Sequence, residues 1–322
     1  MADPENTQLN RRSYTREDFL DIAKSCRTWS LWGDDDELGA ANYVTGSTVV
    51  RGAACVRRGA VFSLALPLDR GGPQTGLGSR VNSQHLMLRL PTDPYLEGRT
   101  ERFTDDAVYL PLQAATQWDA LCHMFYDGMT YNGRGSDSVN SSGAVYNSIT
   151  NIKDRAVGRG VLLDLPRAKG RRWLEPGEAI QAEDLRDCAE RQGVDFGEGD
   201  FLLIRTGHLA RRREEGAWGD FAGGPAPGVA VSAAVLACER HVVGVASDTW
   251  GLEVMPGEVS DFVMPVHYTL LVNAGVYIGE MWDVEALALD CAIDGVYEFF
   301  LSAPPLTITG AVASPLNPLA IK

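Results

Sequence analysis

The sequence has a deficit of positive charge and no long apolar run. Its 29 Lys and Arg residues are outnumbered by 43 Asp and Glu residues, which gives a formal net charge of -14. Nucleic-acid binders need a basic face, and the short Arg211–Arg213 cluster is followed at once by Glu214 and Glu215. No apolar stretch approaches the roughly 20 residues that span a bilayer, and the polar first residues lack the apolar core of a secretory signal. We therefore expect a cytoplasmic protein that binds neither nucleic acid nor membrane.

Several common catalytic and cofactor motifs are also missing. The six cysteines form no CxxC pair, which argues against a zinc ribbon or a redox dithiol, and we expect Cys122 to be a small buried residue. The stretch Gly71–Ser79 lacks the glycine patterns that cradle phosphates, so it predicts a flexible loop and no nucleotide cofactor. The absence of a GxSxG elbow removes the commonest serine-hydrolase arrangement.

The order of apolar segments predicts a mixed α/β protein, with strand-like runs first and alternating helices and strands later. Residues 1–50 are expected to form an arm with short helices, and residues 51–322 one catalytic domain. Predicted strands are Val61–Leu68, His85–Leu90, Val108–Leu112, Gly160–Pro166, Asp200–Gly207, Val242–Asp248 and Val276–Glu280, with a terminal pair at Val296–Ala303 and Leu306–Pro315. Predicted helices are Thr15–Lys24, Ala182–Gly193, Val231–Arg240 (capped by Ser232) and His267–Gly275.

Polar side chains are concentrated where one predicted strand ends. Gln113, Gln117 and Asp119 have the same parity, so in an extended chain they project to one side. His123 follows Asp119 by four residues and stays on the same side if the chain turns helical there. From spacing alone, a hydrogen-bonded polar strand end is the simpler interpretation. For the other histidines we expect local roles. The ring of His85 is expected to find a hydrogen-bond partner near its own strand, His208 to lie on the surface, and His241 to help end a helix.

This segment resembles the metal-site motif of the cyclase family, the group that contains kynurenine formamidase and isatin hydrolase. The family motif reads H-x-G-T-H-x-D-x-P-x-H. Thr116, Asp119 and His123 match it, whereas Gln113 and Gln117 stand where the family has two metal-binding histidines. Ala115 and Leu121 replace the motif's Gly and Pro.

A second stretch, Pro265–Leu287, is similar to a later family segment and places His267 and Glu280 at the same site. The resemblance implies a mixed sheet or barrel-like core with flanking helices, the swivelling β/β/α-like fold of the family. It also implies a divalent cation among the ligands, with the motif's last histidine, His123, moving protons. Imidazole exchanges protons near neutral pH, which suits that role. Thr116 would orient the loop or a bound water.

The two glutamines leave the metal question open. A set of Gln113, Gln117, Asp119, His267 and Glu280 is rich in oxygen and should hold zinc less tightly than the family pattern. The site therefore holds a harder ion such as Mn²⁺, or binds metal weakly or through other residues. Alternatively it has lost the metal and works by hydrogen bonding and acid–base chemistry alone. In that case the acid and base still come from Asp119, Glu280, His123 and His267, and the glutamines orient a substrate carbonyl.

The resemblance implies hydrolysis of a small cyclic amide, lactone or aryl formamide. One alternative is a metal-independent cyclase, isomerase or lyase of secondary metabolism, and a second is a non-catalytic binder of small molecules. Trp118, Phe125 and Tyr126 flank the motif and are candidates to bind a flat substrate, with core packing as the competing interpretation. Since family members are usually oligomers, a homodimer or homotetramer is expected, with the N-terminal arm at an interface.

Overall fold

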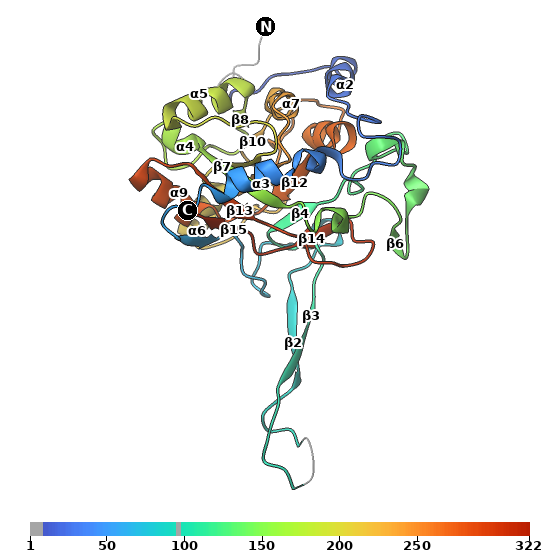
Figure 1. The fold of residues 1–322 in the computed structure, drawn as a ribbon, viewed down its shortest axis with the longest axis vertical. Coiled ribbons are helices and arrows are strands. Elements are labelled where there is room, and N and C mark those ends of the chain that lie inside the picture. The colour runs from blue at the N-terminus through green and yellow to red at the C-terminus, as the bar shows by residue number, and fades with distance from the viewer. Residues whose placement is uncertain (1–8, 95–97) are drawn as a thin grey trace.

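A computed structural model describes residues 9–94 and 98–322, and its centre is a curled, half-barrel sheet of nine strands (Figure 1). Four neighbouring strands run parallel, and antiparallel strands extend the sheet on both sides. Across the sheet, the order is β1 (Val61–Ser63), β15 (Leu319–Ile321), β13 (Glu298–Ser302), β7 (Val157–Asp164), β9 (Phe201–Arg205), β11 (Gly244–Ser247), β12 (Tyr277–Glu280), β4 (Gln117–Asp119) and β14 (Ala313–Pro315). The predicted α/β fold class is confirmed.

Helices flank this sheet, as Figure 1 shows for α5 and α7 on one side. The α-helices are α2 (Arg16–Ser25), α3 (Gly46–Ala53), α4 (Leu165–Ala168), α5 (Ala182–Gln192), α6 (His208–Glu215), α7 (Val231–Glu239), α8 (Pro265–His267) and α9 (Glu285–Asp294). A π-helix, η6 (Tyr268–Ala274), continues α8, and 3-10 turns lie at η1 (Gly39–Tyr43), η2 (Leu77–Ser79), η3 (Tyr131–Gly133), η4 (Ser136–Ser138) and η5 (Ile149–Ile152). Among the described residues, every helix is too short or too polar to cross a lipid bilayer.

Short apolar runs form the parallel strands because both faces of the sheet are covered there. The residues of β11 are all buried, as are the first four of β9, which fits strands packed on both sides. α3 lies close against β7, and a Cβ on Gly52 would stand 2.4 Å from the carbonyl carbon of Gly158. Glycine is therefore required at position 52 for the helix to approach the strand.

Three smaller two-stranded ribbons lie outside the main sheet. They are β8 (Ala179–Ile180) with β10 (Gly228–Val229), β5 (Val139–Asn140) with β6 (Gly143–Ala144), and β2 (Gln84–Arg89) with β3 (Asp105–Tyr109). The β2–β3 ribbon projects far from the body of the molecule (Figure 1). The predicted strands His85–Leu90 and Val108–Leu112 therefore exist, with shifted bounds, but belong to an exposed hairpin.

The predicted helices are found close to their expected bounds. α5 has Glu183 and Asp184 in its first turn and is followed by Gly193, whose φ of +63° is the left-handed conformation typical of the residue after a helix. α2 follows Thr15, whose side chain accepts a hydrogen bond from the Asp18 amide. Of the expected N-terminal arm, residues 9–50 pack on the body, and residues 1–8 lie outside the described residues. A domain boundary at residue 50 stays a prediction.

Three local predictions are wrong. The terminal strands do not pair with each other, because β13 lies between β7 and β15 while β14 pairs with β4. Ser232 does not cap α7, whose N-cap is Ala230; its hydroxyl instead accepts a hydrogen bond from the Ala182 amide at the start of α5. His208 is fully buried at the start of α6, where its ring stacks on Phe221.

Candidate active site

Strand β4 brings the predicted polar residues to one face of the sheet. Gln117 and Asp119 are fully buried and share a face because they are two residues apart on a strand. β12 runs antiparallel beside β4, with Glu280 directly opposite Gln117. Directly opposite residues of an antiparallel pair point to the same side of the sheet. The Glu280 carboxylate therefore lies on the same face as Gln117 and Asp119.

The Gln117 side chain ties the two carboxylates together. Its Nε2 atom donates to Glu280 Oε2 at 2.9 Å and to Asp119 Oδ1 at 3.2 Å. Gln117 Oε1 and Asp119 Oδ2 are buried and have no hydrogen-bond partner within the described chain. The Gln117 amide therefore donates to both carboxylates. Two oxygen atoms of the cluster, Gln117 Oε1 and Asp119 Oδ2, are left without a donor.

His267, the last residue of α8, enters the same cluster. Glu253 accepts hydrogen bonds from the backbone amides of Val266 and His267, at 3.3 and 3.2 Å, and from His267 Nδ1 at 2.6 Å. The ring is thereby oriented with Nε2 3.2 Å from Glu280 Oε1 and 4.0 Å from Asp119 Oδ2. Asp119, His267 and Glu280 each offer a ligand atom, and the three atoms lie within 4.8 Å of one another.

Burial and mutual charge set the protonation of this cluster. Burial raises the pKa of Asp119, and the nearby Glu280 carboxylate raises it further, while the His123 and His267 rings oppose this. Burial disfavours a charged His267, but its hydrogen bonds to Glu253 and Glu280 outweigh that effect and raise its pKa to about 10. Burial also disfavours a charged Glu280, but the hydrogen bond from His267 lowers its pKa overall. The carboxylates around His267 therefore favour its charged form.

His123 lies in a turn beside the cluster and faces a cavity. Residues 120–124 form a turn with no helix, and the His123 amide donates to the Ala120 carbonyl at 2.9 Å. His123 Nε2 is nevertheless 3.8 Å from Asp119 Oδ1, so the turn keeps the ring on the Asp119 side. Gln113 Nε2 lies 3.4 Å from His123 Nδ1 and connects the first glutamine to the site.

The cavity of about 510 Å³ opens between this turn and the segment before α8. His123 and His267 line it, and Phe125, Tyr126 and Phe262 give it an aromatic wall. The rings of Tyr126 and Phe262 are 5.1 Å apart, and the Arg16 guanidinium lies 5.5 Å from the Phe262 ring. Such a hollow suits a small, flat molecule.

Two predicted site residues lie behind the cluster. Trp118 projects to the opposite face of β4 into the hydrophobic core, where it packs edge-on against Trp282 and donates to the Ala303 carbonyl. The structure therefore does not bring Trp118 to the cavity. The Thr116 hydroxyl accepts from the Leu66 amide at 2.8 Å and donates to the Met281 carbonyl at 2.5 Å, so it holds the backbone next to Glu280.

The backbone on either side of the cluster is strained. Met264, before Pro265 of α8, and Met281, directly after Glu280, have φ values of +59° and +58°. Non-glycine residues seldom adopt this conformation, and such strain is concentrated at functional sites. Cys122, in contrast, is buried and burial raises the pKa of its thiol to about 12, which agrees with the predicted structural role.

Sequence reasoning missed Glu253, Phe262 and Arg80. Glu253 lies in a loop with no motif around it, and only the fold brings it to His267. Phe262 reaches the cavity from the loop between β11 and α8. The positive charge of Arg80 favours the charged forms of Asp119 and Glu280, and its guanidinium lies 5.0 Å from the Trp250 ring. The spacing of these residues in the sequence gives no signal that could have found them.

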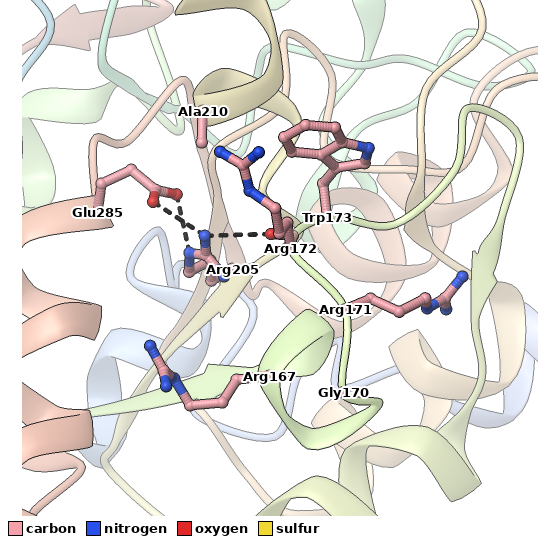
Figure 2. A pocket seen from close by; sticks show the side chains of 8 residues that line it. All are labelled: Arg167, Gly170, Arg171, Arg172, Trp173, Arg205, Ala210 and Glu285. Atoms are coloured by element: carbon pink, nitrogen blue, oxygen red, sulfur yellow. Dashed lines mark hydrogen bonds and ion pairs between the residues drawn. The ribbon is translucent and has the colours of Figure 1, made fainter. Parts of the chain in front are cut away.

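A second cavity, of about 470 Å³, is rich in arginine but has balanced charges (Figure 2). Arg205 makes two hydrogen bonds to Glu285, at 2.8 and 2.9 Å, and a third at 2.8 Å to Asp164. Arg167 also bonds Asp164, and the remaining two arginines, Arg171 and Arg172, pair with Glu178 and Glu214. Because each guanidinium already has a carboxylate partner, this cavity offers no uncompensated positive charge to a ligand.

Fold and site together define a member of the cyclase family. The Cyclase family model matches residues 59–254, which is more than half of the 322 residues, so the chain belongs to this family. The matched region contains β4 and the His123 turn, while His267 and Glu280 lie beyond it. No protein of curated function matches the chain significantly.

Solved structures share the fold over most of their length. The crystal structure of a novel cyclase is 40% identical, has a TM-score of 0.84, and the match covers 93% of this chain and 99% of that one. Isatin hydrolase A from Labrenzia aggregata is 22% identical with a TM-score of 0.58, over 83% and 94% of the two chains. A protein described as a predicted metal-dependent hydrolase, from Bacillus stearothermophilus, is 21% identical with a TM-score of 0.52, over 82% and 98%.

Proposed function

We propose that this protein is a hydrolase that opens a small cyclic amide or lactone, or cleaves an aryl formamide, at the Asp119 cluster. The observation that carries the proposal is Asp119 Oδ2, a fully buried carboxylate oxygen without a hydrogen-bond partner in the described chain, 4.0 Å from His267 Nε2. Buried polar atoms are nearly always satisfied, so one left unsatisfied beside His267, which lines the cavity, is a position where a bound ion or substrate atom would fit. The family membership and the hydrolases among its fold relatives support the reaction class.

The donor set fits a divalent cation. Two carboxylates and one imidazole within 4.8 Å of one another are the ligands that Mn²⁺ or Zn²⁺ accepts. Asp119, His267 and Glu280 would hold the ion, with Gln117 Oε1 as a further candidate and Gln113 more distant beside His123. Such an ion polarises a substrate carbonyl and makes bound water more acidic. His267 would have to lose its Nε2 proton to accept it.

The protein's own groups supply positioning and proton transfer. Phe125 and Tyr126 would stack on a flat ring and place its carbonyl above the cluster. His123 would take a proton from the attacking water and return it to the departing nitrogen or oxygen. Gln113, 3.4 Å from the ring, would orient His123 during this exchange.

A second candidate function, metal-independent ring closure, isomerisation or elimination, is favoured by one observation. Gln117 Nε2 already donates to both Asp119 and Glu280, and His267 Nε2 lies 3.2 Å from Glu280 Oε1. In that case the cluster is complete without an ion, and Asp119 and His123 would exchange protons with the substrate directly.

One experiment separates the two candidates. Purified protein is analysed for metal content and assayed with bicyclic lactams, lactones and aryl formamides, before and after chelation and after Mn²⁺ or Zn²⁺ is restored. We expect hydrolysis that chelation abolishes, that either ion restores, and that Asp119→Asn reduces by at least about 100-fold. Asp164→Asn, which alters an equally buried carboxylate beside Arg205, is the matched control and should retain activity. Turnover that is unchanged by chelation would instead support the metal-independent candidate.

A further inference from the structure

Helix α2 of the N-terminal arm reaches the rim of the cavity beside the active-site cluster. The Phe19 ring is fully buried and packs on Phe262 and Tyr268, with ring centroids 4.8 and 5.9 Å apart, which fixes the helix on the body. Arg16 is the first residue of α2 and lines the cavity. A segment outside residues 59–254, which the family model matches, therefore contributes a charged group to the cavity.

The positive charge of Arg16 is not neutralised within the described chain. Its guanidinium donates to the Asp261 carbonyl oxygen at 3.1 Å and to the Tyr126 hydroxyl at 3.4 Å, both of which are neutral acceptors. Among residues 9–94 and 98–322, no carboxylate oxygen lies within ion-pair distance of it. The hydrogen bond to Tyr126 makes the largest contribution to the raised pKa of Arg16, and the Asp261 charge makes the smallest. Since a guanidinium carries several N–H donors, Arg16 has donors and charge left for a ligand.

The Arg16 guanidinium lies against the aromatic wall of the cavity. It is 5.9 Å from the centre of the Tyr126 ring and 5.5 Å from that of the Phe262 ring, and these two rings are 5.1 Å apart. A flat ring that stacks on this wall therefore brings its substituents close to Arg16. The guanidinium is planar and binds a carboxylate through two parallel hydrogen bonds, which makes it selective for this group.

An anionic ligand needs a local cation to bind to this chain. The formal net charge is -14, and His267 in the cavity lining lies against the carboxylates of Glu253 and Glu280. These negative charges repel an anion. In the lining that the described residues form, Arg16 is the one side chain of Lys or Arg type, so it is the group that would hold an anion there.

We propose that Arg16 is a specificity residue that binds an anionic substituent, in the first instance a carboxylate, on an aromatic substrate. This inference rests on the proposed function and narrows its substrate class to aryl formamides, cyclic amides or lactones that carry a carboxylate outside the bond that is hydrolysed. Stacking on Tyr126 and Phe262 would hold the ring, and the contact with Arg16 would fix its orientation relative to His123. A neutral molecule of the same shape makes the stacking contact alone and should bind more weakly.

Ligand binding tests the proposal without any need for turnover. The full-length protein is titrated by calorimetry with an aminobenzoate and with the matching neutral aminobenzamide, as purified and after chelation. The wild type should bind the aminobenzoate at least about 10-fold more tightly, before and after chelation, and Arg16→Gln should abolish this preference. Arg12→Gln, which removes an exposed arginine that pairs with Glu183 in the same arm, is the matched control and should behave as wild type.

Kinetic measurements separate a failure of this inference from a failure of the proposed function. With formamidobenzoates as substrates, Arg16→Gln should raise KM at least about 10-fold and leave kcat within about threefold, whereas both constants for the neutral formamidobenzamides should not change. Equal affinity of the wild type for the acid and the amide, a preference that persists in Arg16→Gln, or a preference that disappears on chelation (because an ion held the carboxylate) would each overturn the role of Arg16. If no compound is hydrolysed, the proposed function is wrong, and the titrations still decide whether Arg16 binds the anion.

Discussion

Asp119, His123 and His267 differ in how tightly the structure fixes them. His267 is held through Nδ1 by Glu253, at 2.6 Å, and Asp119 is held by Gln117. Among residues 9–94 and 98–322, the polar contacts of the His123 ring are limited to Gln113 Nε2 at 3.4 Å and Asp119 Oδ1 at 3.8 Å. A ring held this loosely, in the lining of the cavity, can exchange protons with a bound molecule, whereas both ring nitrogens of His267 lie against carboxylates.

This difference predicts the effect of His123→Gln. Glutamine keeps a polar side chain at the cavity but cannot carry a proton, so kcat should fall by about 10² to 10⁴ while KM changes little. Steady-state kinetics on the substrate found in the panel would measure both constants. His85→Gln, on the exposed ribbon, is the control for loss of an imidazole. A kcat within a factor of three of wild type for His123→Gln would remove His123 from the mechanism.

His208 predicts how stability depends on pH. Burial lowers its pKa to about 4, against an ordinary value of 6.5, and neither ring nitrogen has a hydrogen-bond partner among the described residues. Because the unfolded chain binds the proton more readily between these two pKa values, stability is lost as the pH falls from 6.5 toward 4. From pH 7.5 to 5.5 this residue alone should remove about 1 kcal/mol.

The variant His208→Phe tests this assignment, since it keeps an aromatic ring against Phe221 but cannot titrate. Urea unfolding at pH 7.5 and 5.5 should show that the variant loses about 1 kcal/mol less than the wild type over this interval. His241→Phe, at an exposed histidine that stacks on Tyr43, is the control. Equal pH slopes for wild type and His208→Phe would contradict the buried-imidazole explanation.

At the scale of elements, helices and strands assist one another across long distances in the chain. The Ser232 hydroxyl in the first turn of α7 accepts from the Ala182 amide at 3.0 Å and donates to Gln181 Oε1 at 2.6 Å. It thereby satisfies an amide at the start of α5, a helix that begins 50 residues earlier. One side chain couples the N-termini of two helices that pack on each other.

Ser232→Ala should therefore destabilise the protein through α5. The loss of a capping hydroxyl typically costs about 1 kcal/mol, which urea unfolding would detect. Hydrogen exchange should show the faster opening at the first amides of α5 and not at those of α7. Ser25→Ala, which removes a hydroxyl from an exposed helix end, should change stability by less than about 0.5 kcal/mol. Faster exchange confined to α7 would contradict this assignment.

At the scale of the whole molecule, the site exists only when remote parts of the chain are folded together. Asp119 comes from β4, Glu280 from β12 and His267 from α8. An unfolded chain cannot present these three groups at once. A divalent cation that binds here should therefore stabilise the folded state as a whole.

This stabilisation can be measured by thermal unfolding of chelated protein with Mn²⁺ or Zn²⁺ added back. At an ion concentration 100 times the dissociation constant, the gain should be about 2.7 kcal/mol, which raises Tm. Asp119→Asn should lose most of this gain, and Asp164→Asn should keep it. If neither ion raises Tm, the metal-independent candidate is favoured.

Much of the fold could be predicted because its signals are local. Two strands are indicated by the apolar runs alone, at Gly160–Pro166 and Asp200–Gly207. The end of the helix that begins at Ala182 is indicated by the glycine that follows it. The placement of Trp118 and Ser232 could not be predicted, because both depend on which element lies opposite. His208 was assigned to the surface from the turn before it, but packing against Phe221 decided otherwise.

The sequence by itself determined the family, the order of the α/β elements and the identity of Asp119, His123, His267 and Glu280 as candidates, because residue type and spacing are written in the chain. Only the tertiary structure decided that β12 pairs beside β4, that Gln117 bonds both carboxylates, and that Glu253 orients His267. It also decided that the β2–β3 ribbon projects outward. Contacts between distant segments depend on how sheets and helices pack, and that packing leaves no local trace in the sequence.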